Sequence, residues 1–334
     1  MTTSTRRAFI GGLVATTLVY ACAPAALPRL TPRLRRIGWL SGNATAVVKT
    51  RSLPFFQRIG ELGYVEGHNF AVEWKFAGGK MDELPKLASE LLALPVDVIV
   101  AEAADAQLAV CTATTTTPTV LVLVADPFAS SCVATAAHPG GNTTGVSTGS
   151  IAASEKRVEY LKTTMPGLAR LAVVWSGTQP NMIKTLVPAT VDAARTLGIA
   201  ATPFAVRDAA ELDMTLERIA RDRFDALICL PLETITADRL ARIPDFANKI
   251  GLPQAYADES IARAGGLMSY NSNRAVQYQR VAEFVDKIFN GALPADIPFE
   301  DPTKFDLIIN LTAARKLGRT FPPSVVASAT EVIQ

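Results

Sequence analysis

Short, nearly apolar segments alternate with amphipathic segments along the first half of the chain. The apolar runs cover residues 36–40, 97–101 and 120–124, and residues 69–76 alternate as in a strand. Between them the spacing of apolar residues predicts helices up to about residue 62, over 82–94, from about 104, and from about 129 to 138. Strands that are apolar on both faces and separated by helices indicate a parallel sheet covered on both sides.

The same alternation begins again in the second half of the chain. Strands are predicted at residues 171–175, 200–206, 226–230 and 253–256, with helices at 181–197, 209–220 and 236–250. A strand at 266–270, a helix at 274–289, a strand at 305–310 and a helix near 313 follow. This last part is too short for a third domain, so the pattern predicts an α/β protein of two doubly wound, Rossmann-like lobes.

The first 34 residues have a different pattern. The arginine pair Arg6–Arg7 precedes an apolar run over residues 8–21, and a proline-rich linker follows. The run is long enough for the core of a signal peptide and shorter than the about 20 residues of a membrane span. Because the arginine pair resembles a twin-arginine export signal, we expect a periplasmic protein with residues 1–34 as signal peptide and linker.

Cys22 lies where a lipoprotein would be cleaved and acylated, although the bulky Tyr20 stands where that sequence box prefers a small residue. Two outcomes stay open: a lipid anchor on Cys22, or simple cleavage within residues 21–26. A lipid on Cys22 is the only membrane attachment that we expect.

The other three cysteines, Cys111, Cys132 and Cys229, lie in apolar stretches without CxxC spacing. An odd set of this kind argues against a disulfide framework and against a metal site. Cys111 and Cys132 could pair in an oxidising compartment, but the expectation is three buried free thiols.

Composition and motifs exclude several functional classes. The formal charge is +2 without a basic stripe, which argues against a nucleic-acid partner. Both histidines, His68 and His138, stand beside turn-forming residues, and no GxSxG, HExxH or GxxxxGK[ST] motif occurs. The glycine-rich stretch at 140–145 reads as a turn between a helix and a strand. We therefore predict no catalytic residue, no metal and no cofactor.

Polar residues recur at the carboxyl ends of predicted strands, where open α/β sheets bind ligands because the following helices point free N–H groups at the crevice. Hydroxyls there could hold an anion, carboxylates an amine, and tyrosine rings an apolar group, although Asp126 could simply cap a helix starting near residue 129. The candidate ligand residues are Ser41, Glu102, Ala103, Asp126, Ser147, Ser176, Asn181, Glu233, Tyr256, Asp258 and Tyr270.

Several longer motifs point to one family. Residues 62–69 read LGYVEGHN, residues 126–127 read DP, and residues 138–147 read HPGGNTTGVS. GGLMSY at 265–270 and PTKFDLIIN at 302–310 complete the set, which resembles the tryptophan/tyrosine-type ABC substrate-binding proteins from about residue 36 to 334. The chain departs from common family strings at residues 102–105, 175–181 and 232–233, so the resemblance leaves the ligand open.

The resemblance implies a type I periplasmic-binding-protein fold with three crossovers between lobes. It also implies capture of a solute by lobe closure, an ABC permease as partner, and no catalysis. The solute that we expect is small and carboxylate-bearing or amino-acid-like, with or without an aromatic group. We expect a monomer with residues 35–149 and 266–298 in lobe one and residues 150–265 and 299–334 in lobe two. Two other classes stay open: an α/β enzyme using Asp126 or Glu102, and the ligand-sensing module of a regulator or signalling partner.

Overall fold

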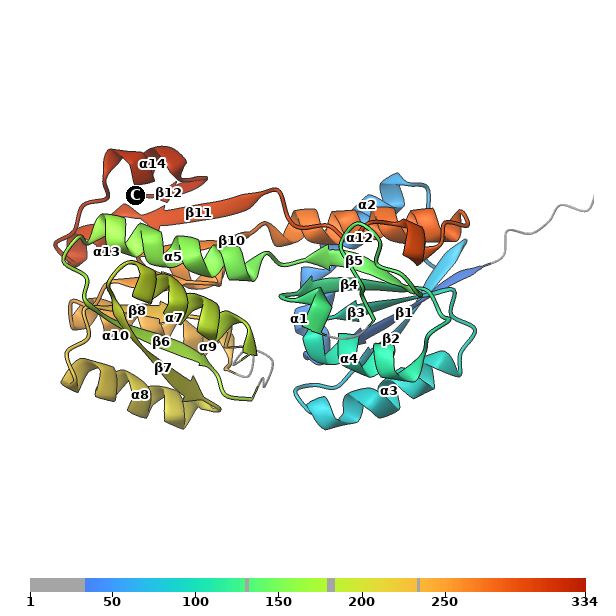
Figure 1. Cartoon of the computed structure of the whole chain (residues 1–334), viewed down its shortest axis with the longest axis horizontal. Helices are drawn as coiled ribbons and strands as arrows, with labels where there is room; N and C mark the ends of the chain where they lie inside the picture. The colour runs from blue at the N-terminus through green and yellow to red at the C-terminus, as the bar shows by residue number, and fades with distance from the viewer. Residues whose placement is uncertain (1–33, 130–131, 179–183, 233–234) are drawn as a thin grey trace, which may run out of the picture. The chain divides into compact units, whose positions relative to one another are not determined.

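The structure is a computed structural model that describes residues 34–334 apart from 130–131, 179–183 and 233–234 (Figure 1). The predicted signal peptide with Cys22 and two candidate ligand residues, Asn181 and Glu233, lie outside the described residues. Within the described part, none of the helices has the length and apolar character that crossing a membrane requires.

The first sheet has five parallel strands in the order β2-β1-β3-β4-β5. The central strands β1, β3 and β4 are buried almost throughout, as their apolar sequences predict. The strands are β1 (Arg35–Ser41), β2 (Phe70–Phe76), β3 (Val98–Glu102), β4 (Thr119–Val124) and β5 (Thr143–Ser147).

Helices cover both faces of this sheet. One core cluster joins α3 and α4 to one face, and a second joins α1, α2 and α12 to the other. Helix α12 comes from far along the chain and lies beside α2, as Figure 1 shows. The helices are α1 (Thr45–Arg51), α2 (Leu53–Glu61), α3 (Leu84–Leu92), α4 (Ala104–Ala113) and α12 (Arg274–Phe289), with short 3-10 helices at Met81–Glu83, Pro127–Ala129 and Pro294–Asp296.

The second sheet has seven strands in the order β12-β11-β10-β9-β8-β6-β7. Strands β6 to β10 are parallel, whereas β11 pairs antiparallel with β10 and parallel with β12. The strands are β6 (Arg170–Ser176), β7 (Ala200–Val206), β8 (Ala226–Cys229), β9 (Gln254–Tyr256), β10 (Met268–Ser272), β11 (Phe305–Asn310) and β12 (Glu331–Ile333).

This sheet is also covered on both faces. The larger core cluster joins α5, α7, α13 and α14 to one face, and the smaller joins α8, α10 and α11 to the other. The helices are α5 (Ser150–Thr164), α7 (Leu186–Thr196), α8 (Ala209–Arg221), α9 (Ala237–Leu240), α10 (Arg242–Lys249), α11 (Glu259–Arg263), α13 (Leu311–Lys316) and α14 (Pro323–Ser328).

The prediction of two doubly wound lobes is confirmed, but two of the expected lobe boundaries differ from the sheet membership. Strand β10 belongs to the seven-stranded sheet, so the chain returns to the five-stranded sheet after Ser272 and not at Gly266. Gly265, with a φ of +112°, marks the end of α11 and no change of lobe. The third passage comes later than Pro298, because Phe299 lies in the first core and Glu300 bridges Val146.

Two local predictions also fail. The segment after β4 begins with a single 3-10 turn, and residues 132–138 are irregular where a helix up to His138 was expected. The helix expected over residues 236–250 is divided into α9 and α10 at Ala241.

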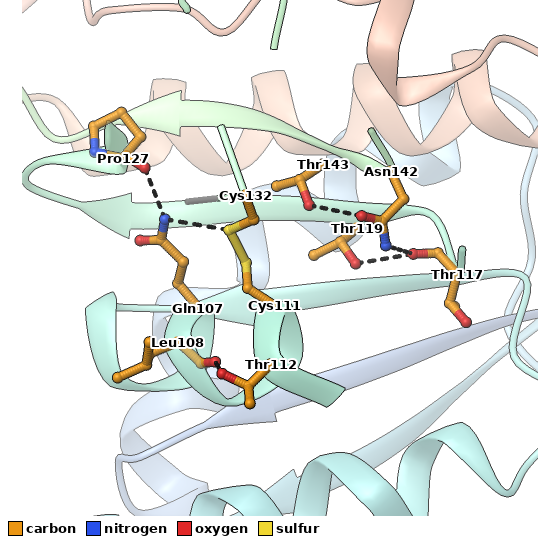
Figure 2. Close-up of a disulfide and its surroundings, with 10 residues drawn as sticks. All are labelled: Gln107, Leu108, Cys111, Thr112, Thr117, Thr119, Pro127, Cys132, Asn142 and Thr143. Carbon is orange, nitrogen blue, oxygen red and sulfur yellow. Dashed lines mark hydrogen bonds between the residues drawn. A yellow bond between two sulfur atoms is a disulfide. The ribbon is translucent and has the colours of Figure 1, made fainter. Parts of the chain in front are cut away.

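The expectation of three free thiols is wrong. Cys111 and Cys132 form a disulfide with a Cα–Cα distance of 5.8 Å, within the normal range for such bonds (Figure 2). Sequence spacing could not show this contact, because it depends on how α4 packs against the segment that follows β4. In the described chain only Cys229 is a free cysteine; it is buried, and desolvation raises the pKa of its thiol to about 12.

Candidate functional site

The strand order of the first sheet reverses between β1 and β3, which makes a switch point at their carboxyl ends. Ligands of doubly wound proteins bind in the crevice outside such a point. Ser41 and Glu102 are register partners at the ends of these two strands. The Ser41 hydroxyl accepts a hydrogen bond from the Asn43 N–H at 3.1 Å, which fixes the turn that leaves β1.

Glu102 lies beneath this edge and not on it. Its side chain is fully buried, and the Trp39 indole N–H donates to its Oε2 atom at 3.4 Å. Burial, and then the nearby Glu102 carboxylate, hold the pKa of the Tyr278 phenol well above its ordinary value. Glu102 therefore organises Trp39 and Tyr278 behind the edge, and a solute could not reach it in this conformation.

Ala103 connects β3 to α4 in a strained conformation. Its φ of 71° and ψ of 166° fall in a region that is normally open only to glycine. Backbone strain of this kind is concentrated at functional sites. The strained residue directly precedes the first turn of α4, whose N–H groups have no carbonyl partners within the helix and favour an anion.

Asp126 follows β4, the strand next to β3. Its Oδ1 atom accepts a hydrogen bond from the Phe128 N–H at 2.9 Å, so the expected capping role holds for one oxygen, at a 3-10 turn instead of a helix. The other oxygen, Oδ2, has no hydrogen-bond partner among the described residues, and the side chain is half-buried. A positive φ at Leu123 and an irregular register between β4 and β5 redirect the strand end toward this position.

Ser147, at the end of β5, forms hydrogen bonds within the crossover between the two sheets. Its hydroxyl donates to Asp301 Oδ1 at 2.5 Å and accepts from the Gly149 N–H at 3.2 Å. The same serine's N–H donates to the Glu300 carbonyl at 2.9 Å. These bonds tie two of the three passages between the sheets together, so Ser147 holds the crossover and offers no free hydroxyl.

The second sheet has its own switch point between β6 and β8. Ser176 is the last residue of β6, is fully buried, and shares a hydrogen bond of 2.9 Å with the Thr178 hydroxyl. Ser176 is therefore a candidate ligand residue that the structure places at this second switch point.

Of the two candidate tyrosines, Tyr256 lies in the core and Tyr270 is partly buried against it. Tyr256 is fully buried, and Gly266 packs so closely on its ring that a Cβ there would lie 2.4 Å from Cε2. The ring of Tyr270 stacks on Phe305 at 5.5 Å and meets Tyr160 edge-on at 5.3 Å. Both rings therefore stabilise the seven-stranded sheet.

Asp258 is paired with a residue that the sequence prediction missed. Arg274, the first residue of α12, donates from Nη2 to Asp258 Oδ2 at 3.2 Å, and Asp258 Oδ1 accepts from the Ser260 N–H at 2.9 Å. Burial acts to raise the pKa of Asp258, but Arg274 and Ser260 outweigh it and lower the pKa below its ordinary value. The ion pair joins the start of α11, beside the second sheet, to α12, beside the first. The negative charge of Asp258 is therefore already balanced by Arg274.

A small polar cavity of about 20 Å³ lies beside this ion pair, with room for about one water molecule. Asn271 and Ser272, at the end of β10, line it together with Arg274. This strand was predicted to end at Tyr270, two residues early, so these two positions were not among the candidates. Counting the strand as running up to the N-cap Asn273 would have found them.

The comparisons agree with this architecture. A "Tyrosine-binding protein" of Clostridioides difficile is 22% identical over 256 residues, which cover 77% of this chain and 73% of that protein. A crystal structure of a conserved domain protein from Vibrio cholerae has a TM-score of 0.80 and 25% identity, over 90% of this chain and 100% of that one. The structure of an ABC domain from Streptococcus pneumoniae in complex with L-Trp has a TM-score of 0.79 and 23% identity, with the same coverage.

The family comparison matches residues 55–333, from within α2 of the first lobe to the last strand of the seven-stranded sheet. The match covers the second switch point and all three passages between the sheets, whereas β1, on one side of the first switch point, lies before its start. The chain belongs to the ABC transporter substrate binding protein family.

Proposed function

We propose that the protein captures a small amino-acid-like solute between the carboxyl edges of its two sheets and delivers it to an ABC permease. The observation that carries the proposal is the Asp126 Oδ2 atom, a carboxylate oxygen with no hydrogen-bond partner among the described residues. Asp126 follows β4, which lies beside β3, the strand that leads into α4. A ligand ammonium group would pair with Asp126, and a ligand carboxylate would meet the N–H groups of α4.

The relatives support an aromatic side chain on the ligand. One is named for tyrosine binding, and another was solved with L-Trp. Trp39 of β1 is fully buried, so its ring does not contact a solute. Its indole N–H donates to Glu102 and so supports the carboxyl end of β3 at the first switch point. L-Tyrosine and L-tryptophan are therefore the first solutes to test.

Adding the right solute is expected to raise the thermal midpoint of the exported protein. A ligand at one hundred times its Kd stabilises the folded state by about 2.7 kcal/mol, which thermal-shift assays resolve readily. The screen covers L-tyrosine, L-tryptophan, the other amino acids, simple aromatic acids and sugars. A response to sugars alone would contradict the amino-acid proposal, and turnover of a bound solute would favour the enzyme class instead.

We further propose that the protein works as a periplasmic monomer, exported by the twin-arginine route and then either cleaved or lipidated at Cys22. The supporting observations are the Arg6–Arg7 pair, the apolar run after it and the family membership. A disulfide in the folded domain also fits an oxidising compartment.

Changing both Arg6 and Arg7 to lysine is expected to leave the precursor in the cytoplasm, because the twin-arginine pathway reads the arginine pair. Fractionation followed by immunoblotting measures this, with the parent signal as the control. Normal export of the variant would show that the general secretory route is used. Mass spectrometry of the mature N-terminus then separates an acylated Cys22 from an unmodified start within residues 21–26.

A further inference from the structure

Helix α4 is attached to the segment after β4 at two points that lie one helical turn apart (Figure 2). The buried Gln107 side chain donates from Nε2 to the Pro127 carbonyl at 2.9 Å, and the same nitrogen lies 3.9 Å from Cys132 Sγ. Four residues later, Cys111 is bonded to Cys132. We call Gln107 and the disulfide together the α4 clamp.

The clamped segment carries the candidate ligand residue Asp126. Residue Pro127, held by Gln107, is its direct neighbour, and Phe128 donates the hydrogen bond that orients the Asp126 carboxylate. The opposite side of Asp126 is fixed through β4, where the Thr148 N–H donates to the Val124 carbonyl at 2.8 Å. The position of Asp126 therefore depends on the clamp on one side and on the sheet on the other.

Beyond Cys132 the segment runs to the third passage between the sheets. Val133 is buried in the first core, and the Ala136 carbonyl accepts a hydrogen bond from the Phe299 N–H at 2.7 Å. The Phe128 ring also lies 6.4 Å from the Phe299 ring. The clamp thus connects the ligand edge to a crossover and does not merely close a peripheral loop.

We propose that the α4 clamp positions Asp126 for ligand binding, so that solute affinity depends on oxidation of Cys111 and Cys132. This inference rests on the proposed function, because it takes Asp126 as the ammonium partner. In the dithiol form the covalent attachment of the segment to α4 is lost, and the Asp126 turn becomes more mobile. A solute then has to order the turn on binding, which lowers its affinity.

The oxidation itself needs an external disulfide, small or protein-borne, as oxidant. One cysteine thiolate attacks a sulfur of that disulfide and releases the first reduced thiol. The second cysteine thiolate attacks the mixed disulfide, which forms the Cys111–Cys132 bond and releases the second thiol. Two electrons pass to the external disulfide together with the two protons of the cysteines. An oxidising compartment supplies such an acceptor, so the binding-competent form is expected after export.

The clamp is tested by hydrogen–deuterium exchange and calorimetry on the folded, exported protein. Exchange is compared between the oxidised parent, the parent reduced with a phosphine, and the Cys111→Ser/Cys132→Ser variant. Peptides covering residues 124–138 are expected to exchange at least tenfold faster in the last two, and peptides from β9 and β10 serve as the internal control. In the same two samples the affinities for L-tyrosine and L-tryptophan are expected to fall about tenfold or more.

A matched control comes from the reductant. Adding it to the double-serine variant should change neither exchange nor affinity, whereas it should change both in the parent. A Gln107→Leu variant, which keeps the disulfide, should loosen the same peptides to a smaller degree.

Unchanged exchange at residues 124–138 after reduction would overturn the clamp. Faster exchange with unchanged affinity would overturn its role in ligand binding. If the oxidised parent binds neither amino acid, the amino-acid proposal fails, while the exchange experiment still decides whether the clamp holds the segment.

Discussion

Arg157→Ala is expected to lower the free energy of unfolding by about 3–4 kcal/mol, whereas Arg157→Met should stay within about 1 kcal/mol of the parent. Arg157 of α5 is fully buried and donates to the Tyr270 carbonyl at 2.9 Å and to the Ser154 hydroxyl at 2.6 Å. No carboxylate in the described chain pairs with it, and its Nε atom has no hydrogen-bond partner. Alanine leaves a cavity and two unpaired acceptors, but methionine fills the volume and removes an uncompensated charge.

The pH dependence distinguishes the charge from the volume. Desolvation lowers the pKa of Arg157 from 12.5 to about 10 in the folded protein. Below pH 10 the charged side chain therefore carries its full desolvation cost, and between the two pKa values the unfolded state binds more protons, so stability rises with pH. The free energy of unfolding of the parent should therefore rise relative to that of Arg157→Met between pH 9 and pH 11. Urea unfolding of both proteins would measure this. A difference that stays constant over this range would refute the buried-charge account.

Asp126→Asn is expected to weaken amino-acid binding by about 30- to 150-fold, equivalent to about 2–3 kcal/mol for the loss of a partly desolvated charge pair. Asparagine can still accept the Phe128 hydrogen bond through its own Oδ1, so the turn should keep its shape. The substitution therefore removes the charge and little else. Calorimetry measures the affinities, and thermal unfolding confirms that the variant is folded.

The sharper comparison uses ligands without the amine. The parent should prefer L-tryptophan to indole-3-propionic acid, and Asp126→Asn should lose most of that preference. Glu83→Gln, at an exposed position on the same lobe, is the matched charge control and should keep the parent's preference. Equal loss of affinity for both ligands in the Asp126 variant would mean that Asp126 shapes the site without contacting the amine.

The order of strands and helices was predictable because the central strands of the parallel sheets are apolar on both faces. The runs at 97–101 and 120–124 became β3 and β4 with only small shifts in their ends. The lobe boundaries were harder, because Gly265 ends a helix and the return to the first sheet begins at the N-cap Asn273. A glycine in the sequence predicts that the chain turns there, but it does not show which sheet the next strand joins.

The candidate site was predictable in its location and not in its details. The carboxyl ends of the strands were foreseen, but sequence could not show that Glu102 and Tyr256 are fully buried, since burial depends on which helix covers each strand end. It could not show the partners of Ser147 and Asp258 either. Asp301 comes from 154 residues beyond Ser147, and Arg274 stands 16 residues beyond Asp258, on the far side of β10.

The late origin of α12 has a consequence for synthesis. Its residues Tyr278, Val281 and Phe284 fill the same core as Ile37 and Trp39 at the start of the first lobe. A nascent chain that has emerged only as far as β9 carries this lobe with one apolar face partly uncovered, so the lobe made first stays incomplete until α12 has been made. Chaperones would have the longest contact with that face, and a fragment that ends before Arg274 is expected to aggregate.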